Sequence, residues 1–514
     1  MNGADTLLQT LVASGVEVCF TNPGTSEMHF VAALDKQDGM RGVLGLFEGV
    51  VTGAADGYAR MAGKPACTLL HLGPGMANGL ANLHNARRAR VPIVNIVGEH
   101  ATYHRHLDAP LTSNIEGFAS PVSGWIHVSE SASKVAEDTA IAVQASYGPP
   151  GQIATLILPA DTAWNDASKA AAPLPKLIPP DPSSETIIKV AKALKSNKRS
   201  ALLLNGAATT SEGLALAGKI ASATGARLLG DTFLTRISRG AGEVDINRVP
   251  YFAEQAEKVL DGLDYLILVG TKAPVTFFAY PGKSSELTPG NCEAISLATP
   301  NENIINALQS VVDEIGATHT QPKRNSYAEA TLPTESKLSG ATIGQSLAAQ
   351  MPEHAIIVNE SGTSGFAPSA TRSAHPHDWM DLTGGAIGIG LPLATGAAIA
   401  CPDRKVLALE GDGAGMYTVQ ALWTHARENL DITTIIFSNR KYSILQVEFA
   451  RVGAHNPGPK AMGMLELTNP DLDWVSLANG MGVPGERVDS THAFNLALKR
   501  GLEVDGPYLI EALV

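Results

Sequence analysis

"LALEGDGAGMYTVQALWTHARENLDITTIIFSNRKYS" (residues 407–443) contains two apolar runs separated by a helical pattern. The runs ending at Gly411 and Ser438 have the length and composition of buried strands, and residues 416–430 have the apolar spacing of a helix. This order predicts one right-handed βαβ unit in a parallel sheet. Asp412 and Asn439 directly follow the two strands, so we expect them side by side at the sheet edge where open α/β folds bind ligands.

The residue types at this edge favour a metal-bound anion. A carboxylate, an amide oxygen and a nearby main-chain carbonyl are oxygen ligands of the kind Mg²⁺ prefers. Glycines at 411, 413 and 415 allow close backbone approach, and the N-terminal amides of the following helix favour a negative group. The pattern therefore predicts a diphosphate held through a metal; the alternative is an ordinary glycine-rich turn with no ligand.

The same alternation of apolar runs and helical patterns extends over most of the chain. It predicts an α/β fold with parallel sheets covered on both faces. Two stretches interrupt the alternation: 165–184, which is rich in Pro, Ala and Ser, and 318–337, which is polar. We therefore expect three doubly wound α/β domains, at 1–164, 185–317 and 338–514.

Composition excludes several classes of protein. The net charge is −12 with no basic run, so a nucleic-acid partner is not expected. No window is long and apolar enough for a membrane span, and the N-terminal residues lack a signal-peptide pattern. The four scattered cysteines predict neither a disulfide framework nor a zinc site, and a reducing, cytoplasmic location is expected.

The glycine-flanked Asp412, followed at this distance by Asn439, resembles the signature of thiamin diphosphate-dependent enzymes. The chain is similar to benzoylformate decarboxylase and the acetolactate synthase large subunit over nearly its whole length. Four further stretches resemble the family in its order: "FTNPGTSEMHFVAAL" (20–34), "FEGVVTGAADGYAR" (47–60), "HLGPGMANGLANL" (71–83) and "TGGAIGIGLPLATGAAIA" (383–400). The resemblance implies a pyrimidine-binding N-terminal domain, a central domain and a C-terminal domain for the diphosphate and Mg²⁺.

The resemblance also implies roles for individual residues. Asp412, Asn439 and the main-chain carbonyl of Lys441 would bind the metal. Glu48 would activate the cofactor, His71 would transfer protons near the substrate, and Thr25 would meet the substrate carboxylate. Further residues would contact the cofactor: Gly362, Thr363, Gly385, Ile387 (under its two rings), Gly411, Gly413, Ala414 and Tyr442.

The implied activity is decarboxylation of a 2-oxo acid, which ends either in release of an aldehyde or in condensation with a second carbonyl compound. A lyase acting on 2-hydroxy ketones and a non-catalytic cofactor-binding homologue are alternatives. A nicotinamide dehydrogenase is not expected, because no GxGxxG follows an early strand with an acidic residue downstream.

The sequence also departs from the family patterns. The decarboxylase has a second active-site histidine in its central domain, and Phe278 or Ala279 stands there in this chain. The glutamine-bearing segment of the synthases is missing as well. No flavin is expected. The resemblance implies a homodimer or homotetramer with the active site between subunits; the sequence leaves the particular 2-oxo acid open.

Overall fold

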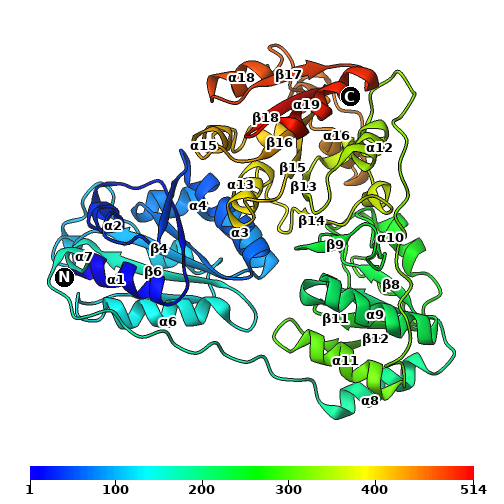
Figure 1. The fold of residues 1–514 in the computed structure, drawn as a ribbon, viewed down its shortest axis with the longest axis horizontal. Coiled ribbons are helices and arrows are strands. Elements are labelled where there is room, and N and C mark those ends of the chain that lie inside the picture. The colour runs from blue at the N-terminus through cyan, green and yellow to red at the C-terminus, as the bar shows by residue number, and fades with distance from the viewer.

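In the computed structural model, which describes residues 1–514, three sheets form three lobes around the centre of the molecule (Figure 1). The first sheet is entirely parallel, in the order β2-β1-β3-β4-β6-β5. Its strands are β1 (Val18–Thr21), β2 (Arg41–Leu44), β3 (Ala66–Leu70), β4 (Ile93–Glu99), β5 (Trp125–Val128) and β6 (Ile153–Pro159). Strands β1, β3, β4 and β6 coincide with four of the apolar runs in the sequence. Every residue of these four strands is buried.

The helices of this lobe lie between its strands and at the two ends of the segment. They are α1 (Gly3–Ala13), η1 (Thr25–Glu27), α2 (Met28–Leu34), α3 (Glu48–Ala62), α4 (Leu72–Ala89), η2 (Arg105–Leu107), α5 (Ile115–Ala119), α6 (Val135–Tyr147) and α7 (Ala160–Trp164). The first helix begins with a capping box, in which the Asn2 side chain accepts from the Asp5 amide and the Asp5 carboxylate accepts from the Asn2 amide.

The second sheet is also parallel, in the order β10-β8-β7-β11-β12. Its strands are β7 (Ser200–Leu204), β8 (Arg227–Gly230), β10 (Asn247–Arg248), β11 (Tyr265–Val269) and β12 (Glu293–Ala298). The helices of this region are α8 (Ser184–Leu194), η3 (Gly206–Thr209), α9 (Ser211–Thr224), α10 (Ala253–Leu260) and α11 (Ile304–Glu314).

The third sheet contains the βαβ unit and has the order β17-β18-β16-β15-β13-β14-β9. Its strands are β9 (Ile237–Arg239), β13 (Ile356–Glu360), β14 (His377–Asp381), β15 (Val406–Gly411), β16 (Ile432–Ser438), β17 (Gly485–Val488) and β18 (Tyr508–Leu513). All neighbours pair in parallel except β9, which pairs antiparallel with β14. The α/β class with three sheets is confirmed. Strand β9 comes from the central segment but joins the third sheet, which the alternating sequence pattern did not predict.

The helices of the third lobe are α12 (Gly340–Gln350), η4 (Gly362–Ser364), η5 (Pro368–Thr371), α13 (Gly390–Ala400), α14 (Asp412–Gly415), α15 (Ala421–Arg427), α16 (Ser443–Arg451), α17 (Pro459–Gly463), α18 (Trp474–Gly480) and α19 (Thr491–Glu503). The predicted helix at 416–430 is wrong in its bounds. The chain makes a single helical turn at α14 and a second short helix, α15, and between them the Thr418 hydroxyl donates to the Gly388 carbonyl.

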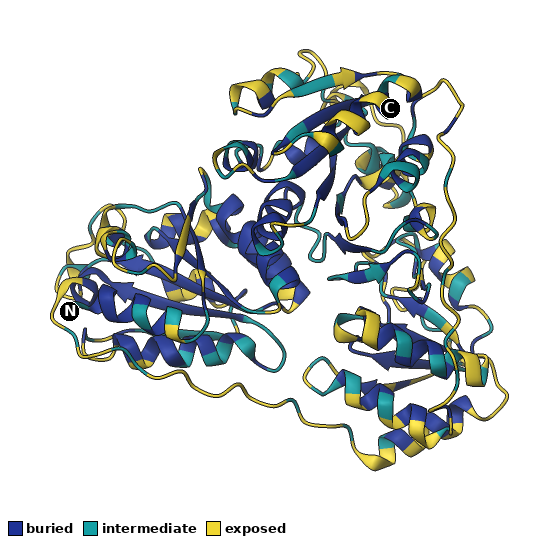
Figure 2. Ribbon diagram, viewed as in Figure 1, coloured by how far each residue is buried: buried dark blue, intermediate teal, exposed yellow.

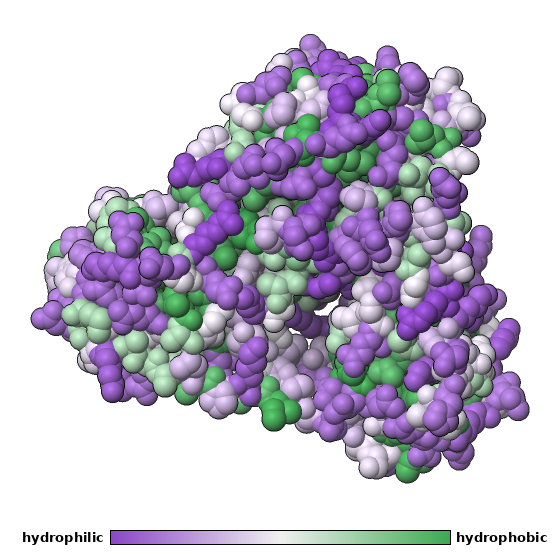
Figure 3. All heavy atoms as spheres, in the orientation of Figure 1, coloured by the Kyte–Doolittle hydropathy of each residue, from purple (hydrophilic) through white to green (hydrophobic).

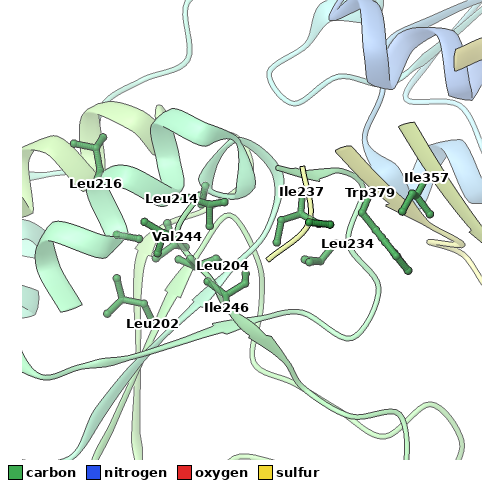
Figure 4. Close-up of a cluster of buried hydrophobic side chains, with 14 of the residues drawn as sticks. Leu202, Leu204, Leu214, Leu216, Leu234, Ile237, Val244, Ile246, Ile357 and Trp379 are labelled. Carbon is green, nitrogen blue, oxygen red and sulfur yellow. The ribbon is translucent and has the colours of Figure 1, made fainter. Parts of the chain in front are cut away.

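Two buried contact regions join the third lobe to the others. Helices α3 and α13 cross closely because each has a glycine at the contact: a Cβ at Gly57 would collide with the Leu393 backbone, and one at Gly396 with the Ala54 backbone. On the other side, Ile237 of β9 lies next to Trp379 of β14, so the core of the central lobe continues into the third (Figure 4).

The segments 165–183 and 318–337 contain no helix or strand. The first is a long, largely exposed connection (Figure 2), as expected for a linker. The exact domain bounds remain a prediction. On the face drawn in Figure 3, apolar residues form small separate patches among polar ones. No helix in the structure has both the length and the apolar character needed to cross a membrane. All four cysteines are free.

Candidate active site

Asp412 and Asn439 follow adjacent strands, because β15 and β16 pair in parallel with Gly411 opposite Phe437. Asp412 accepts two main-chain hydrogen bonds, from the Gly413 amide (2.9 Å) and from the Arg440 amide (2.6 Å). The Arg440 bond ties the end of one strand to the end of the next. The structure therefore brings these two predicted site residues to the same sheet edge.

Asn439 is held by its neighbours. Its amide nitrogen donates to the Ser364 hydroxyl (2.6 Å) and to the Ser443 hydroxyl (3.0 Å), and its amide oxygen accepts from the Lys441 amide (3.0 Å). These bonds identify the oxygen end of the side-chain amide, which lies next to the Lys441 backbone. Ser364 was not singled out from the sequence, although it lies in the stretch 359–365 that supplied Gly362 and Thr363.

The surroundings of Asp412 fit a cation. Its residue is only 3% exposed, and it forms no salt bridge with any Lys, Arg or His side chain. Burial raises the pKa of this carboxyl, while the Arg440 and Gly413 amides oppose the shift. A buried carboxylate with no positive partner is costly unless a cation neutralises it. No cluster of three or more His, Cys, Asp or Glu side chains forms a metal site, so a metal here would use Asp412, the Asn439 amide and main-chain oxygen.

The glycine loop is covered on one side by Tyr442. A Cβ on Gly413 would lie 2.5 Å from Tyr442 Cε1, so only glycine allows the ring to pack at this point. A Cβ on Gly411 would meet no heavy atom closer than 3.5 Å. Gly411 and Ala414 are half-buried, and the loop thus has one face closed by an aromatic ring and one that a ligand can approach.

The turn at 383–388 carries Gly385 and Ile387. Gly385 has a φ of +81°, a conformation that favours glycine. Asn85 of α4 holds the turn through two bonds with Ala386, donating to its carbonyl (2.7 Å) and accepting from its amide (3.2 Å). Ile387 is half-buried, and Gly362 and Thr363 are exposed in η4.

Glu48 is the first residue of α3 and is half-exposed. Its carboxylate accepts a hydrogen bond from the Asn78 side chain of α4 (2.9 Å). Asn82, one turn further along α4, donates to the carbonyls of both Gly49 (2.8 Å) and Gly388 (3.3 Å). The start of α3 and the 383–388 turn are therefore connected through one amide group.

His71 forms a pair with Glu27, a residue that no sequence motif had marked. The imidazole Nδ1 lies 2.7 Å from Glu27 Oε2, which also accepts from the Gly24 amide (2.8 Å). Burial raises the pKa of Glu27, and His71 opposes this shift. The His71 side chain keeps 23% exposure, and Thr25 at the start of η1 is exposed. Glu27 follows Thr25 by two residues, but only the fold shows that it meets His71.

Two buried carboxyl groups beneath the site were also missed. Glu360 of β13 accepts from the Gly388 amide (2.9 Å) and the Gly390 amide (2.6 Å), so it supports the 383–388 turn from below. Glu410 lies opposite it in the register of β13 and β15. Burial raises the pKa of Glu360 to about 7 and, together with the neighbouring Glu360, raises that of Glu410 well above its ordinary value. The apolar pattern that predicts these strands does not reveal that the two carboxyl groups at their ends lie together.

Comparisons with known proteins give the family. Residues 1–120 match the thiamine pyrophosphate enzyme N-terminal TPP binding domain, and residues 360–512 match the C-terminal TPP binding domain. The chain is 51% identical over its whole length to the "Putative acetolactate synthase large subunit IlvX" of Mycobacterium tuberculosis, covering 99% of that protein. It is 28% identical to benzoylformate decarboxylase of Pseudomonas aeruginosa, covering 97% of this chain and 96% of that one.

A solved structure has the same fold. The thiamine diphosphate-dependent 4-hydroxybenzoylformate decarboxylase of Rhodococcus jostii superposes with a TM-score of 0.83 at 24% identity, over 100% of this chain and 99% of that one. The resemblance read from the sequence is thereby confirmed at the level of family and fold. The chain belongs to the thiamine pyrophosphate enzymes, in the group of the decarboxylases and acetolactate synthases.

Proposed function

We propose that the protein is a thiamin diphosphate- and Mg²⁺-dependent decarboxylase of 2-oxo acids. When bound, the cofactor supplies a carbon nucleophile for the keto carbon and accepts the electrons left when carbon dioxide departs. The observation that favours decarboxylation over condensation is the His71–Glu27 pair, with its 2.7 Å contact and partly exposed imidazole. Such a pair can deliver a proton at the point where an aldehyde product needs one.

Asp412, Asn439 and the Lys441 carbonyl would hold the metal, and through it the diphosphate. The unneutralised, buried carboxylate of Asp412 supports this assignment. Residues of η4, of the 383–388 turn and of the glycine loop would contact the rest of the cofactor. They are Gly362, Thr363, Gly385, Gly411, Gly413, Ala414 and Tyr442. Ile387 would support the cofactor from below, in the turn that Asn85 and Glu360 hold in place.

Glu48 would bind a ring nitrogen of the cofactor, and its half-exposed carboxylate leaves room for such a bond. Thr25, exposed in η1 two residues before Glu27, would bind the substrate carboxylate. We infer that a homodimer or homotetramer is the active form, with Glu48 of one copy meeting the metal site of another. The free cysteines agree with a cytoplasmic location, and no flavin is proposed.

A second candidate is condensation of the decarboxylated substrate with another carbonyl compound. It is favoured by the relative at 51% identity, which is named as an acetolactate synthase large subunit. A lyase acting on 2-hydroxy ketones would use the same residues. A non-catalytic homologue is less well supported, because Glu48, Asp412 and Asn439 are all present.

The test is to incubate the purified protein with thiamin diphosphate, Mg²⁺ and a panel of 2-oxo acids, and to follow carbon dioxide and the organic products. An aldehyde as sole product supports the decarboxylase, whereas acetolactate or another hydroxy ketone supports condensation. If the protein binds the cofactor but releases no carbon dioxide from any member of the panel, the proposed activity is wrong.

A further inference from the structure

Glu360 and Glu410 lie at the ends of two strands that each lead into a segment proposed to hold the cofactor. Glu360 is the last residue of β13 and precedes η4, and Glu410 of β15 directly precedes Gly411 and Asp412. The two residues are opposite each other in the strand register and are 5% and 0% exposed. The buried pair therefore joins two cofactor-facing segments at their base.

Glu360 also holds the turn that carries Ile387, the residue proposed to support the cofactor rings. Its two oxygens accept from two different amides, those of Gly388 (2.9 Å) and Gly390 (2.6 Å). The Gly388 carbonyl accepts from the hydroxyl of Thr418, which follows the glycine loop (2.8 Å). The backbone after Ile387 is thus fixed on both sides, and on one side by a carboxylate that uses both of its oxygens.

Glu410 packs against the same point of the turn. A Cβ on Gly390 would lie 2.1 Å from Glu410 Oε2 and 3.1 Å from Glu360 Cβ, so only glycine leaves room for both carboxyl groups. The Glu410 oxygens have no N–H or O–H donor as a partner. Two adjacent buried carboxyl groups do not both ionise, because like charges repel strongly where water is excluded. Since Glu360 uses both oxygens as acceptors, the proton is assigned to Glu410, which lies within hydrogen-bonding reach of Glu360.

We propose that Glu360 and Glu410 are positioning residues that couple the metal-diphosphate end of the site to the turn beneath the cofactor rings. The inference rests on the proposed function, since it assigns a role within that same site. Glu410 is continuous with the glycine loop and donates to Glu360, and Glu360 fixes the turn. Because both carboxyl groups are buried, they act through this backbone and not on the cofactor itself.

Stabilisation of the sheet alone does not account for the pair. Apolar residues of similar volume are commonly as stabilising as buried charged groups, or more so, and the rest of both strands is mostly apolar. Apolar side chains cannot, however, accept from the amides of Gly388 and Gly390, and a buried amide left unpaired is costly. The need for an acceptor with two oxygens therefore comes from the turn, where the cofactor rings are expected.

The test compares the binding of thiamin diphosphate with that of inorganic pyrophosphate, each with Mg²⁺, by calorimetry. Pyrophosphate can occupy only the metal-diphosphate end, so the ratio of the two dissociation constants measures the contribution of the ring end. In Glu360→Gln the side-chain NH₂ would face one of the two turn amides. The cofactor should then bind about 10- to 100-fold more weakly, the range expected for one charge-assisted hydrogen bond, while pyrophosphate binds as in the wild type.

Glu410 allows a rescue experiment. Glu410→Gln keeps an N–H donor toward Glu360 and should bind both ligands as the wild type does. Glu410→Met has a similar length but no donor, and it should lose affinity for the cofactor only. Thr433→Val is the matched control, because it removes a buried hydrogen bond to the Gly501 carbonyl in the same sheet (2.7 Å). It should lower the stability of the protein and leave the ratio of dissociation constants unchanged.

These measurements need no turnover, so they separate the inference from the proposed activity. If the variants behave as predicted while the wild type consumes no 2-oxo acid, the coupling stands and the proposed activity fails. Equal weakening of both ligands in Glu360→Gln would overturn the inference. So would a Glu410→Gln protein that binds the cofactor as weakly as Glu410→Met, and these two variants decide the matter if Glu360→Gln does not fold.

Discussion

Two carboxyl groups of the first lobe, Glu48 and Glu27, differ in their surroundings and hence in what they can do. Glu48 is half-exposed and bonded only to an amide side chain, so it is available to a ligand. Glu27 is buried beneath His71, with its second oxygen, Oε1, unpartnered. It can orient the imidazole and influence its proton, but the ring stands between it and the solvent.

Glu48→Gln should lower kcat by at least about 100-fold while Mg²⁺ and cofactor still bind, because the amide keeps the shape but loses the proton-accepting group. Steady-state kinetics and a fluorescence titration with the cofactor measure the two effects. Glu17→Gln, at an exposed position, is the control and should match the wild type. An unchanged kcat in Glu48→Gln would remove this residue from the proposed mechanism.

Glu27→Gln should affect proton transfer rather than cofactor binding. The amide can still form a hydrogen bond with His71 but removes the carboxylate charge beside the imidazole. We expect kcat for aldehyde release to fall about 10-fold or more, with the cofactor titration unchanged. If hydroxy ketone formation falls as much as aldehyde release, the pair serves general positioning and not protonation.

At the scale of elements, strand positions could be predicted well and helix bounds less well. The apolar runs of β1, β3, β4, β6 and the βαβ strands are buried on both faces, so composition alone marks them. The helical pattern at 416–430 failed because the segment after Asp412 bends so that Thr418 bonds the distant Gly388 carbonyl. Partners that are distant in the sequence, such as Phe277 at Gly385 or Glu27 at His71, left no local signal.

Helix α15 carries a prediction about acid stability. His425 is buried, and its Nε2 lies 3.1 Å from the Leu391 carbonyl and 2.9 Å from the Thr395 hydroxyl of α13. Burial lowers its pKa from 6.5 to about 4. The unfolded chain therefore binds a proton more readily than the folded one, so stability is full above pH 6.5 and falls as the pH drops toward 4. The loss from this residue is about 3 kcal/mol at most.

Thermal unfolding followed by calorimetry from pH 7 to pH 4 measures this effect. His425→Gln should have a lower Tm at pH 7 but a shallower decline of Tm with falling pH. Part of the decline of Tm with falling pH should remain in both proteins, because burial lowers the pKa of His377 to about 4 as well. His319→Gln, at an exposed position, should follow the wild-type curve. A His425→Gln curve parallel to the wild type would contradict the assignment.

At the scale of the whole molecule, one buried ion pair connects all three lobes. Arg60 on α3 forms two bonds with Asp56, at 2.8 and 2.7 Å, and both side chains are fully buried. Its remaining donors reach the carbonyls of Thr235 (3.0 Å) and Asp381 (2.8 Å) in the other two lobes. The sequence could predict three α/β segments. It could not predict this connection or the pairing of β9, because both join residues that are far apart in the chain.

Arg60→Ala should destabilise the protein by about 3–5 kcal/mol, because it leaves Asp56 charged and buried without its partner. Arg41→Ala is the matched control: Arg41 also bonds across two lobes, to Glu428, but is exposed, so its loss should cost no more than about 1 kcal/mol. Urea unfolding measures both. Similar small losses in the two variants would show that Arg60 does not hold the lobes together.

The central claim is that the ends of β15 and β16 bind the metal-diphosphate end of the cofactor. A crystal structure with thiamin diphosphate and Mn²⁺ in place of Mg²⁺, using anomalous scattering to locate the metal, tests it most directly. We predict one strong anomalous peak within coordination distance of Asp412, Asn439 and the Lys441 carbonyl, joined to the diphosphate oxygens. A bound cofactor whose metal peak lies away from Asp412 and Asn439 would contradict the account.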